Sequence, residues 1–215
     1  MTTRHALLTT LLIAAFAAPA AAQGYEAGLY LQTGATNVSG MRYSGLGLRA
    51  GASGAVALIP QGRLKFAAEA GYARYGQVAR VRLYDDMQYL NVREAAAFHR
   101  IEFSPLLEVR ATGWFSLAGG PVLGLMLGGR VRTLVETATD GNFSRRVYTE
   151  RLGGYYTTAG FGVQVRAGFR ATDGLWIDLS YMQGLHDTAR WWTGASRAIP
   201  QGLLAGLRWL PLRKD

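Results

Sequence analysis

The chain has 215 residues, of which 49% are hydrophobic, 11% aromatic and 17% charged, and its formal net charge is +9. This apolar and weakly charged composition excludes an intrinsically disordered protein. The absence of cysteine excludes a disulfide scaffold, a thiolate metal site and a cysteine nucleophile. Glycine is abundant, at 28 residues, and there is no Gly-X-Y repeat, so the sequence favours a β protein with closely packed backbones over collagen.

The first 22 residues form a segment of their own. Arg4 and His5 give it a basic start, residues 7–18 are an uncharged apolar run, and residues 20–22 are alanines of a cleavage signal before Gln23. An apolar core of about 12 residues is short for a membrane helix, which needs about 20. We therefore predict a cleaved signal peptide over residues 1–22 and an exported mature domain over residues 23–215.

Apolar and polar residues alternate with period two through the mature domain, as in strands that have two different faces. Between residues 64 and 74, for example, Leu64, Phe66 and Tyr72 fall on one face, and Lys65 and Glu69 fall on the other. The alternation predicts eight strands, over residues 25–36, 42–57, 64–74, 98–111, 115–131, 154–170, 175–186 and 201–210.

The predicted connections alternate in length. Three carry Pro, Gly or Asp and are expected to be tight turns, over residues 59–63, 112–114 and 171–174. Three are longer and polar and are expected to be loops, over residues 75–97, 132–153 and 187–200. Residues 37–41 are the short exception. Short turns at one end and long loops at the other are typical of a transmembrane barrel with an even number of strands.

The rival fold is a soluble eight-stranded barrel of lipocalin type, which keeps its apolar face inside. Two features favour the membrane barrel. The polar face is rich in Gly, Ala and Ser, which suits the crowded lumen of a small barrel. Aromatic residues lie near the strand ends, as in the girdles at membrane interfaces: Tyr25, Tyr72, Trp114, Phe115, Phe169, Tyr181 and Trp209. We therefore predict an all-β fold, an eight-stranded antiparallel up-and-down transmembrane β-barrel.

Four short segments resemble, in order, strands of the PorT-like family of small outer-membrane β-barrels of Gram-negative bacteria. They are IEFSPLL at 101–107, LAGGPVLG at 117–124, YMQGL at 181–185 and GLRWL at 206–210. The resemblance implies a porin-like barrel in the cell outer membrane that the barrel-assembly machinery inserts. It carries over no catalytic residues, and members range from secretion-associated factors to barrels of unknown role. Many such barrels end on an aromatic residue. This chain departs from that pattern, because residues 211–215 follow Leu210.

The polar faces of the predicted strands carry charges of both signs. Those expected to form an ion-pair network in the lumen are Arg49, Lys65, Glu69, Arg100, Glu102, Glu108, Arg110, Arg166, Asp178 and Arg208. One interpretation is an ion or proton pathway. The favoured one is a packed plug, because eight strands leave room only for side chains and buried charges need partners. Asp178 is expected to pair diagonally with Arg166 and Arg170 across the turn at 171–174.

An enzymatic function has little support in the sequence. His186 and Asp187, or the acidic pair at 85–86, could serve an omptin-type protease, but such proteases are longer ten-stranded barrels. A lipid hydrolase needs a nucleophile such as Ser196 beside a His base and an acid, and no Glu follows His186. Two isolated histidines and no cysteine give no metal-ligand spacing. We therefore predict no catalytic residue, cofactor or metal.

The predicted long loops carry an excess of arginine. Arg145, Arg146 and Arg190, with Trp191 and Trp192, are candidate surface contacts, for which the arginines suit lipopolysaccharide phosphates and the tryptophans suit a protein partner or the interface belt. An ordinary solvated rim is the alternative. No base-stacking motif accompanies the charge, so nucleic acid is not an expected partner. We predict a non-enzymatic outer-membrane barrel with a structural or surface-interaction role, and a secretion- or assembly-associated barrel that binds partner proteins is the alternative.

Overall fold

The computed structural model describes residues 24–38, 43–59, 62–85, 88–139, 142–151, 159–185 and 200–214. Within these ranges the chain forms nine strands: β1 (Tyr25–Val38), β2 (Tyr43–Ala57), β3 (Leu64–Asp85), β4 (Gln88–Arg110), β5 (Phe115–Thr139), β6 (Asn142–Arg151), β7 (Ala159–Thr172), β8 (Leu175–Gly184) and β9 (Pro200–Lys214). A helix able to span a membrane is not found among the described residues. The predicted signal peptide lies outside them.

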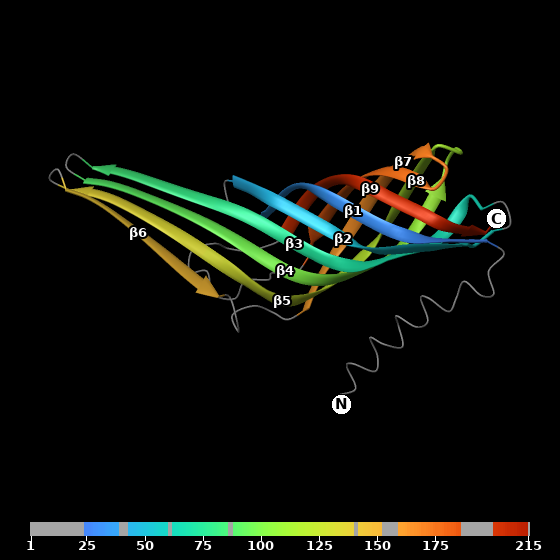
Figure 1. Cartoon of the computed structure of the whole chain (residues 1–215), viewed down its shortest axis with the longest axis horizontal. Coiled ribbons are helices and arrows are strands. Elements are labelled where there is room, and N and C mark those ends of the chain that lie inside the picture. The colour runs from blue at the N-terminus through green and yellow to red at the C-terminus, as the bar shows by residue number, and fades with distance from the viewer. Residues whose placement is uncertain are drawn as a thin grey trace, which may run out of the picture.

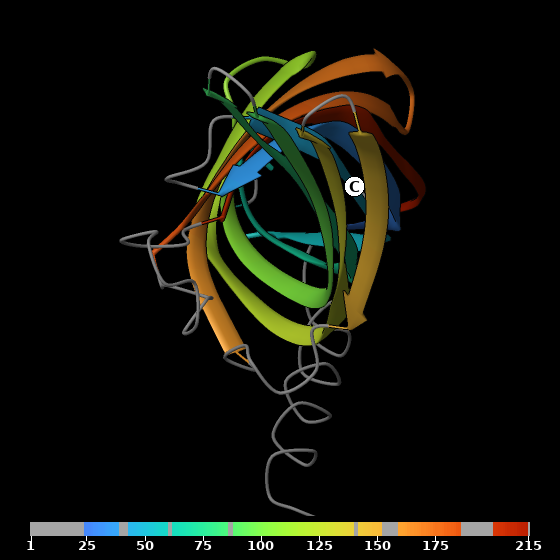
Figure 2. The same ribbon diagram turned by 90° about the vertical axis from the view of Figure 1, so that its left-hand side faces the viewer.

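Eight of the nine strands close into a ring, in the order β1–β2–β3–β4–β5–β7–β8–β9, and β9 returns to pair with β1 (Figures 1 and 2). Every pair of neighbours in the ring is antiparallel. The predicted eight-stranded antiparallel barrel is therefore confirmed. Strand β6 lies outside the ring and pairs with residues 130–139 of β5.

Three strands continue well beyond the ring. The outer halves of β3, β4 and β5 join β6 in a four-stranded sheet, which we call the projecting sheet and which extends to the left in Figure 1. The loops predicted over 75–97 and 132–153 are therefore wrong for most of their length. Their residues are rich in Val, Tyr, Leu and Thr, which favour strands, and β3 and β4 stay in register from Leu64↔Val109 to Asp85↔Gln88.

The tight turns lie at the opposite end of the ring. Gly62 donates its backbone N–H to the Ile59 carbonyl at 2.9 Å, and Thr112 Oγ1 accepts the Phe115 N–H at 3.0 Å. Gly62 and Gly174 have φ values of 65° and 79°, which glycine adopts without steric cost. Tyr25 pairs with Lys214 at this same end. The short predicted connection at 37–41 falls partly in β1, and residues 39–42 and 186–199 lie outside the described residues.

The ring is apolar outside and polar inside. Along β7, Phe161 and Val165 are 46% and 56% exposed, whereas Gln164 and Arg166 between and beside them are 1% and 0% exposed. A lipocalin-type barrel would show the reverse pattern. The structure therefore corresponds to a transmembrane β-barrel, whose lipid-facing side chains are apolar and whose interior is polar.

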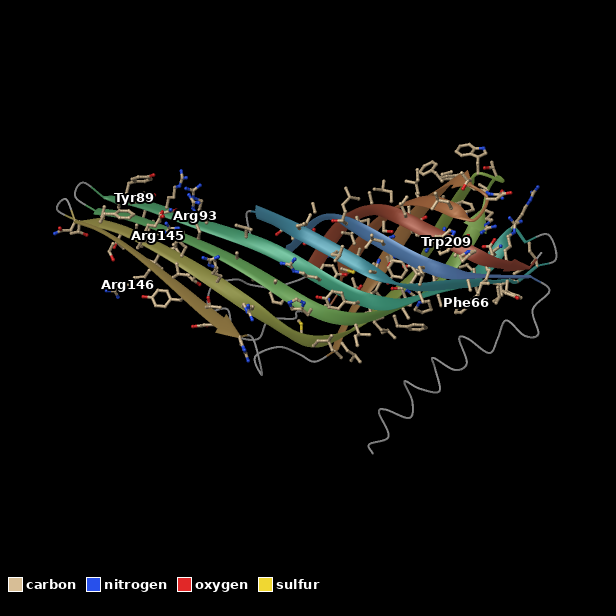
Figure 3. The ribbon with its side chains drawn as sticks, in the orientation of Figure 1. Phe66, Tyr89, Arg93, Arg145, Arg146 and Trp209 are labelled. Carbon is tan, nitrogen blue, oxygen red and sulfur yellow. The ribbon has the colours of Figure 1, made fainter. Side chains whose placement is uncertain are left out.

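Aromatic side chains gather where the apolar belt ends. Phe115 and Phe169 pack with ring centroids 5.2 Å apart beside the turn at 111–114, and Trp114 stacks at 6.3 Å from Phe169. Phe66 and Trp209 lie at this end of the molecule as well (Figure 3). Aromatic side chains gathered at this level are typical of the interface girdle of a membrane barrel.

Candidate functional site

The charged lumen is the first candidate site. All ten charged residues that the sequence assigns to the lumen lie on the inner face of the ring, nine of them buried and Arg110 half-buried. The period of two puts them there, because their neighbours along each strand face outward.

Glu108 of β4 is the centre of the first ion-pair cluster. Its Oε2 atom lies 2.6 Å from Arg166 Nη2 and 3.1 Å from Arg208 Nη1, and its Oε1 atom lies 3.2 Å from Arg110 Nε. Arg208 also binds Asp178, with Nε 2.9 Å from Oδ2. Asp178 of β8 thus pairs with Arg208 of β9, and the expected diagonal pairing with Arg166 of β7 is wrong.

A second cluster lies nearer the projecting sheet. Arg49 Nε is 3.0 Å from Glu102 Oε2, and Arg49 Nη2 is 3.7 Å from Glu69 Oε2. Arg166 Nη1 pairs with the other oxygen of Glu69. Since Arg166 also holds Glu108, one guanidinium joins the two clusters into a continuous network.

At the turn end, Glu26 completes the network by pairing with Lys65 Nζ at 3.1 Å and with Arg110. Inside the ring, the described residues include five carboxylates and six cations, namely Glu26, Glu69, Glu102, Glu108 and Asp178 with Arg49, Lys65, Arg100, Arg110, Arg166 and Arg208, and at the turn end Arg213 adds a longer pair to Glu26 at 3.8 Å. Near-balance of charge and direct pairing are what buried ions require. The lumen of this barrel is filled by side chains.

Arg100 stands apart from this network. It is the one lumen cation for which the described residues supply no ion pair, and its Nε has no hydrogen-bond partner among them. Its guanidinium lies 5.9 Å from the centre of the Tyr75 ring, a cation–π distance. A cavity of about 10 Å³ borders Arg100 and Glu102, which is comparable with the volume of one water molecule.

Neutral polar residues complete the lumen, and the sequence analysis missed them. Gln32 donates to Ser180 Oγ at 3.0 Å and accepts from Arg49 Nη1 at 3.2 Å, and the Tyr75 hydroxyl donates to Glu102 Oε1 at 2.7 Å. Gln32 has the same alternation phase as the charged residues, which would have identified it. Tyr75 was hidden because it falls in a segment predicted to be a loop.

The predicted surface contacts divide into two groups. Arg145 and Arg146 are exposed on β6, and as consecutive strand residues they occupy opposite faces of the projecting sheet (Figure 3). Arg190, Trp191, Trp192 and His186 lie outside the described residues. Across the described part of the chain, no three His, Asp or Glu side chains come together as metal ligands would.

The outer face of the projecting sheet is strongly basic. This face continues the lipid-facing side of the ring, since its residues on β3 and β4 have the same alternation phase as the lipid-facing Tyr72 and Ile101. Strand register places eight arginines on it, namely Arg74, Arg80, Arg82, Arg93, Arg130, Arg132, Arg145 and Arg151. Glu136 is a carboxylate on the same face. It lies 3.9 Å from Arg145 Nε and accepts a hydrogen bond from Asn91 at 2.6 Å. This face is the second candidate site, and anions are its natural ligands.

The opposite face of the projecting sheet carries carboxylates. Glu94 of β4 stands opposite Thr133 of β5, and Glu150 of β6 stands opposite Val131. Partial burial, together with the negative charge of Glu150, raises the pKa of Glu94 above its usual 4.5, and a hydrogen bond with Thr133 offsets part of this rise. The two faces of the sheet therefore differ in charge.

Comparison with known proteins gives structural likenesses alone. No protein-family model matches the chain, and no curated protein matches it. Among solved structures, Ail, the attachment invasion locus protein of Yersinia pestis, aligns over 88% of this chain and 99% of its own at 11% identity, with a TM-score of 0.36. Neisserial surface protein A aligns over 87% and 97% at 16% identity (TM-score 0.38), and the N-terminal β-barrel domain of Pseudomonas aeruginosa OprF over 87% and 98% at 11% (TM-score 0.27). At these scores we take the fold from the strand order of this chain.

Proposed function

We propose that this chain is a non-enzymatic integral outer-membrane protein with a closed lumen, whose projecting sheet makes contacts at the cell surface. The observation that carries the proposal is the combination of an apolar belt around a lumen of paired charges with a basic sheet that continues beyond the belt. The belt supports membrane insertion, and closed barrels of this kind belong to the bacterial outer membrane.

The lumen has a structural role in this proposal. Glu108, Arg166 and Arg208 are each fully buried and each bind at least two partners, so their charges hold neighbouring strands together. An ion pathway requires sites that an ion can enter and leave. The side chains of this network bind one another and leave little space, which favours a plug.

The basic outer face supports a surface-contact role. In a barrel whose turns and termini face the periplasm, the long ends of β3, β4 and β5 reach the exterior. Phosphate groups of lipopolysaccharide are the anions at that surface which an array of guanidinium groups would bind. Insertion by the barrel-assembly machinery and membership of the PorT-like family remain predictions from the sequence motifs.

A second function, the binding of partner proteins, is favoured by one specific observation. All ten residues of β6 are exposed, and within the described part of the chain this strand pairs along one edge alone, with β5. The free edge of a sheet can receive an extended segment of another protein. Arg145 and Arg146 on this strand oppose unspecific pairing, because charges on an edge strand discourage aggregation.

Site-specific cross-linking in cells separates these possibilities. A photoreactive amino acid at exposed Phe143 of β6 should form adducts with lipopolysaccharide if the first function holds, and with one defined protein if the second holds. The same amino acid at Thr172, exposed at the turn end, serves as the control. Absence of adducts specific to position 143 would contradict a surface-contact role. Steady conductance of the purified protein in planar bilayers would contradict the closed lumen.

A further inference from the structure

An open groove of about 840 Å³ lies on the outer face where the projecting sheet leaves the ring. Two rows of cross-strand neighbours build it. In the first row Arg74 stands beside His99, and His99 stands beside Gly128. In the second row Ala97 stands beside Arg130, and Arg130 beside Arg151. Each row contains one small residue, Gly128 in the first and Ala97 in the second, which keeps the floor low, and the longer side chains of the other members form the walls.

A bulge in β5 opens the groove. The register between β4 and β5 shifts between His99, which faces Gly128, and Arg100, which faces Met126. Gly128 has a φ of 150°, which side chains other than that of glycine rarely adopt, and the space beside its Cα is open. A bulge bends its strand and increases the local twist, so β5 and β6 diverge from the barrel wall at this point.

The groove is lined by hydrogen-bond donors and by no carboxylate. Arg74, Arg130 and Arg151 contribute guanidinium groups, and no ion pair to any of them is found among the described residues. The Tyr72 hydroxyl is hydrogen-bonded to Nδ1 of His99. With the hydroxyl as donor, the ring proton of a neutral His99 is on Nε2, which makes it a further donor. Guanidinium groups bind phosphate oxygens in bidentate geometry.

The lower rim of the groove is apolar and joins the lipid-facing belt. Leu127, which is 60% exposed, and Tyr72 line this rim. Toward the turn end, the exposed Leu123 and Leu125 extend the apolar surface along the outer face of β5. A ligand that fills the groove while resting on the belt therefore needs an anionic head and an apolar tail.

We propose that this groove binds the phosphate group of an outer-leaflet lipid headgroup. Arg74, Arg130 and Arg151 contact the phosphate, His99 donates a further hydrogen bond, and the acyl chains lie along Leu127 and the belt below. The proposal deepens the surface-contact function above and rests on it for the orientation of the barrel in the membrane.

Lipid binding to the purified, folded protein in neutral detergent tests the proposal by native mass spectrometry. The probes are lipid A with two phosphates, the same lipid with both phosphates removed, and soluble glucosamine 1-phosphate. We expect lipid A to bind at least about tenfold more tightly than its dephosphorylated form, as one or two charge-assisted hydrogen bonds provide. Glucosamine 1-phosphate should bind more weakly than lipid A, because it has no contact with the belt.

Two triple variants with equal loss of charge localise the site. The groove variant replaces its three arginines by glutamine, and the distal variant makes the same change at three arginines at the turn end of the barrel, away from the basic outer face, namely Arg63, Arg170 and Arg213. We expect the groove variant to lose the preference for phosphate, about tenfold, and the distal variant to keep it within about twofold.

A third variant tests the shape of the groove without changing its charge. Ala97→Leu fills the floor between His99 and Arg130 and should weaken lipid A binding while the barrel remains folded, as heat-modifiable gel mobility reports. Equal losses in the groove and distal variants, equal binding of phosphorylated and dephosphorylated lipid, or equal binding of the soluble phosphate would each overturn the proposal. Cross-linking at Phe143 tests the surface-contact function separately, since that residue is far from the groove along β6.

Discussion

Arg208 holds Asp178 through two hydrogen bonds across the β8–β9 pair, from Nε to Oδ2 at 2.9 Å and from Nη2 to Oδ1 at 3.3 Å. Both side chains are fully buried. Arg170, the other expected partner of Asp178, pairs with Asp173 at the exposed turn. The buried carboxylate therefore connects the last two strands of the barrel, next to the β9–β1 pair that closes the ring.

Asp178→Ala should destabilise the barrel by about 3–5 kcal/mol, because it leaves the buried guanidinium of Arg208 with Glu108 as its remaining partner. Urea unfolding in detergent measures the loss. Asp173→Ala, which removes an exposed carboxylate, should change the stability by no more than about 1 kcal/mol. Asp178→Leu combined with Arg208→Met should recover part of the loss. Equal stability of Asp178→Ala and the parent would show that this pair does not support the fold.

Gly206→Ala should weaken the closure of the ring between β9 and β1. A Cβ atom at Gly206 would overlap the carbonyl oxygen of Leu31 and lie 2.5 Å from Gln32 Cα, so the two backbones would have to separate. Heat-modifiable gel mobility should show unfolding at a lower temperature. The control is Gly119→Ala, whose Cβ would make an ordinary contact of 3.6 Å. An unchanged melting temperature for Gly206→Ala would contradict the tight β1–β9 seam.

Glu94 should make the projecting sheet more stable at mildly acidic pH than at neutral pH. Its pKa is raised in the folded sheet, so the folded state binds a proton more tightly than the unfolded state. This stabilisation of the sheet is therefore fully present below the ordinary pKa of 4.5 and is lost as the pH rises through the raised pKa. Hydrogen-exchange protection of β4 and β5, corrected for intrinsic rates, measures the effect. Glu94→Gln should raise the protection at pH 7 and reduce its pH dependence, and a decrease at pH 7 would contradict this explanation.

The barrel wall could be predicted from the sequence because the membrane imposes a strict alternation. Phe161 and Val165 must face lipid, and Gln164 and Arg166 must face the lumen, so the hydropathy pattern alone identifies β7. The projecting sheet has water on both faces, and this constraint disappears. All residues of β6 are exposed, and the strand is held by its backbone pairing with β5. Backbone pairing alone imposes no alternation of apolar and polar residues, so the segment that contains β6 was predicted to be a loop.

The contacts of the site depend on register, which the sequence could determine at tight turns alone. The turn at 173–174 fixes β7 against β8, and this is why a diagonal Arg166 partner was expected for Asp178. The actual partner, Arg208, comes from β9, which follows β8 only after a long connection. The groove at Arg74 and Arg130 similarly requires three strands in register and a bulge at Gly128. A single sequence determines neither the register of strands that long segments connect nor the position of a bulge.

Cysteine labelling on intact cells tests the central claim most directly, since the chain has no cysteine of its own. Asn142 is exposed at the tip of the projecting sheet, and Asp173 is exposed at the turn end of the barrel. We expect Asn142→Cys to react with a membrane-impermeant maleimide on intact cells, and Asp173→Cys to react only after the outer membrane is permeabilised. Labelling of Asp173→Cys on intact cells, with Asn142→Cys protected until permeabilisation, would contradict a barrel that spans the outer membrane and presents its projecting sheet to the exterior.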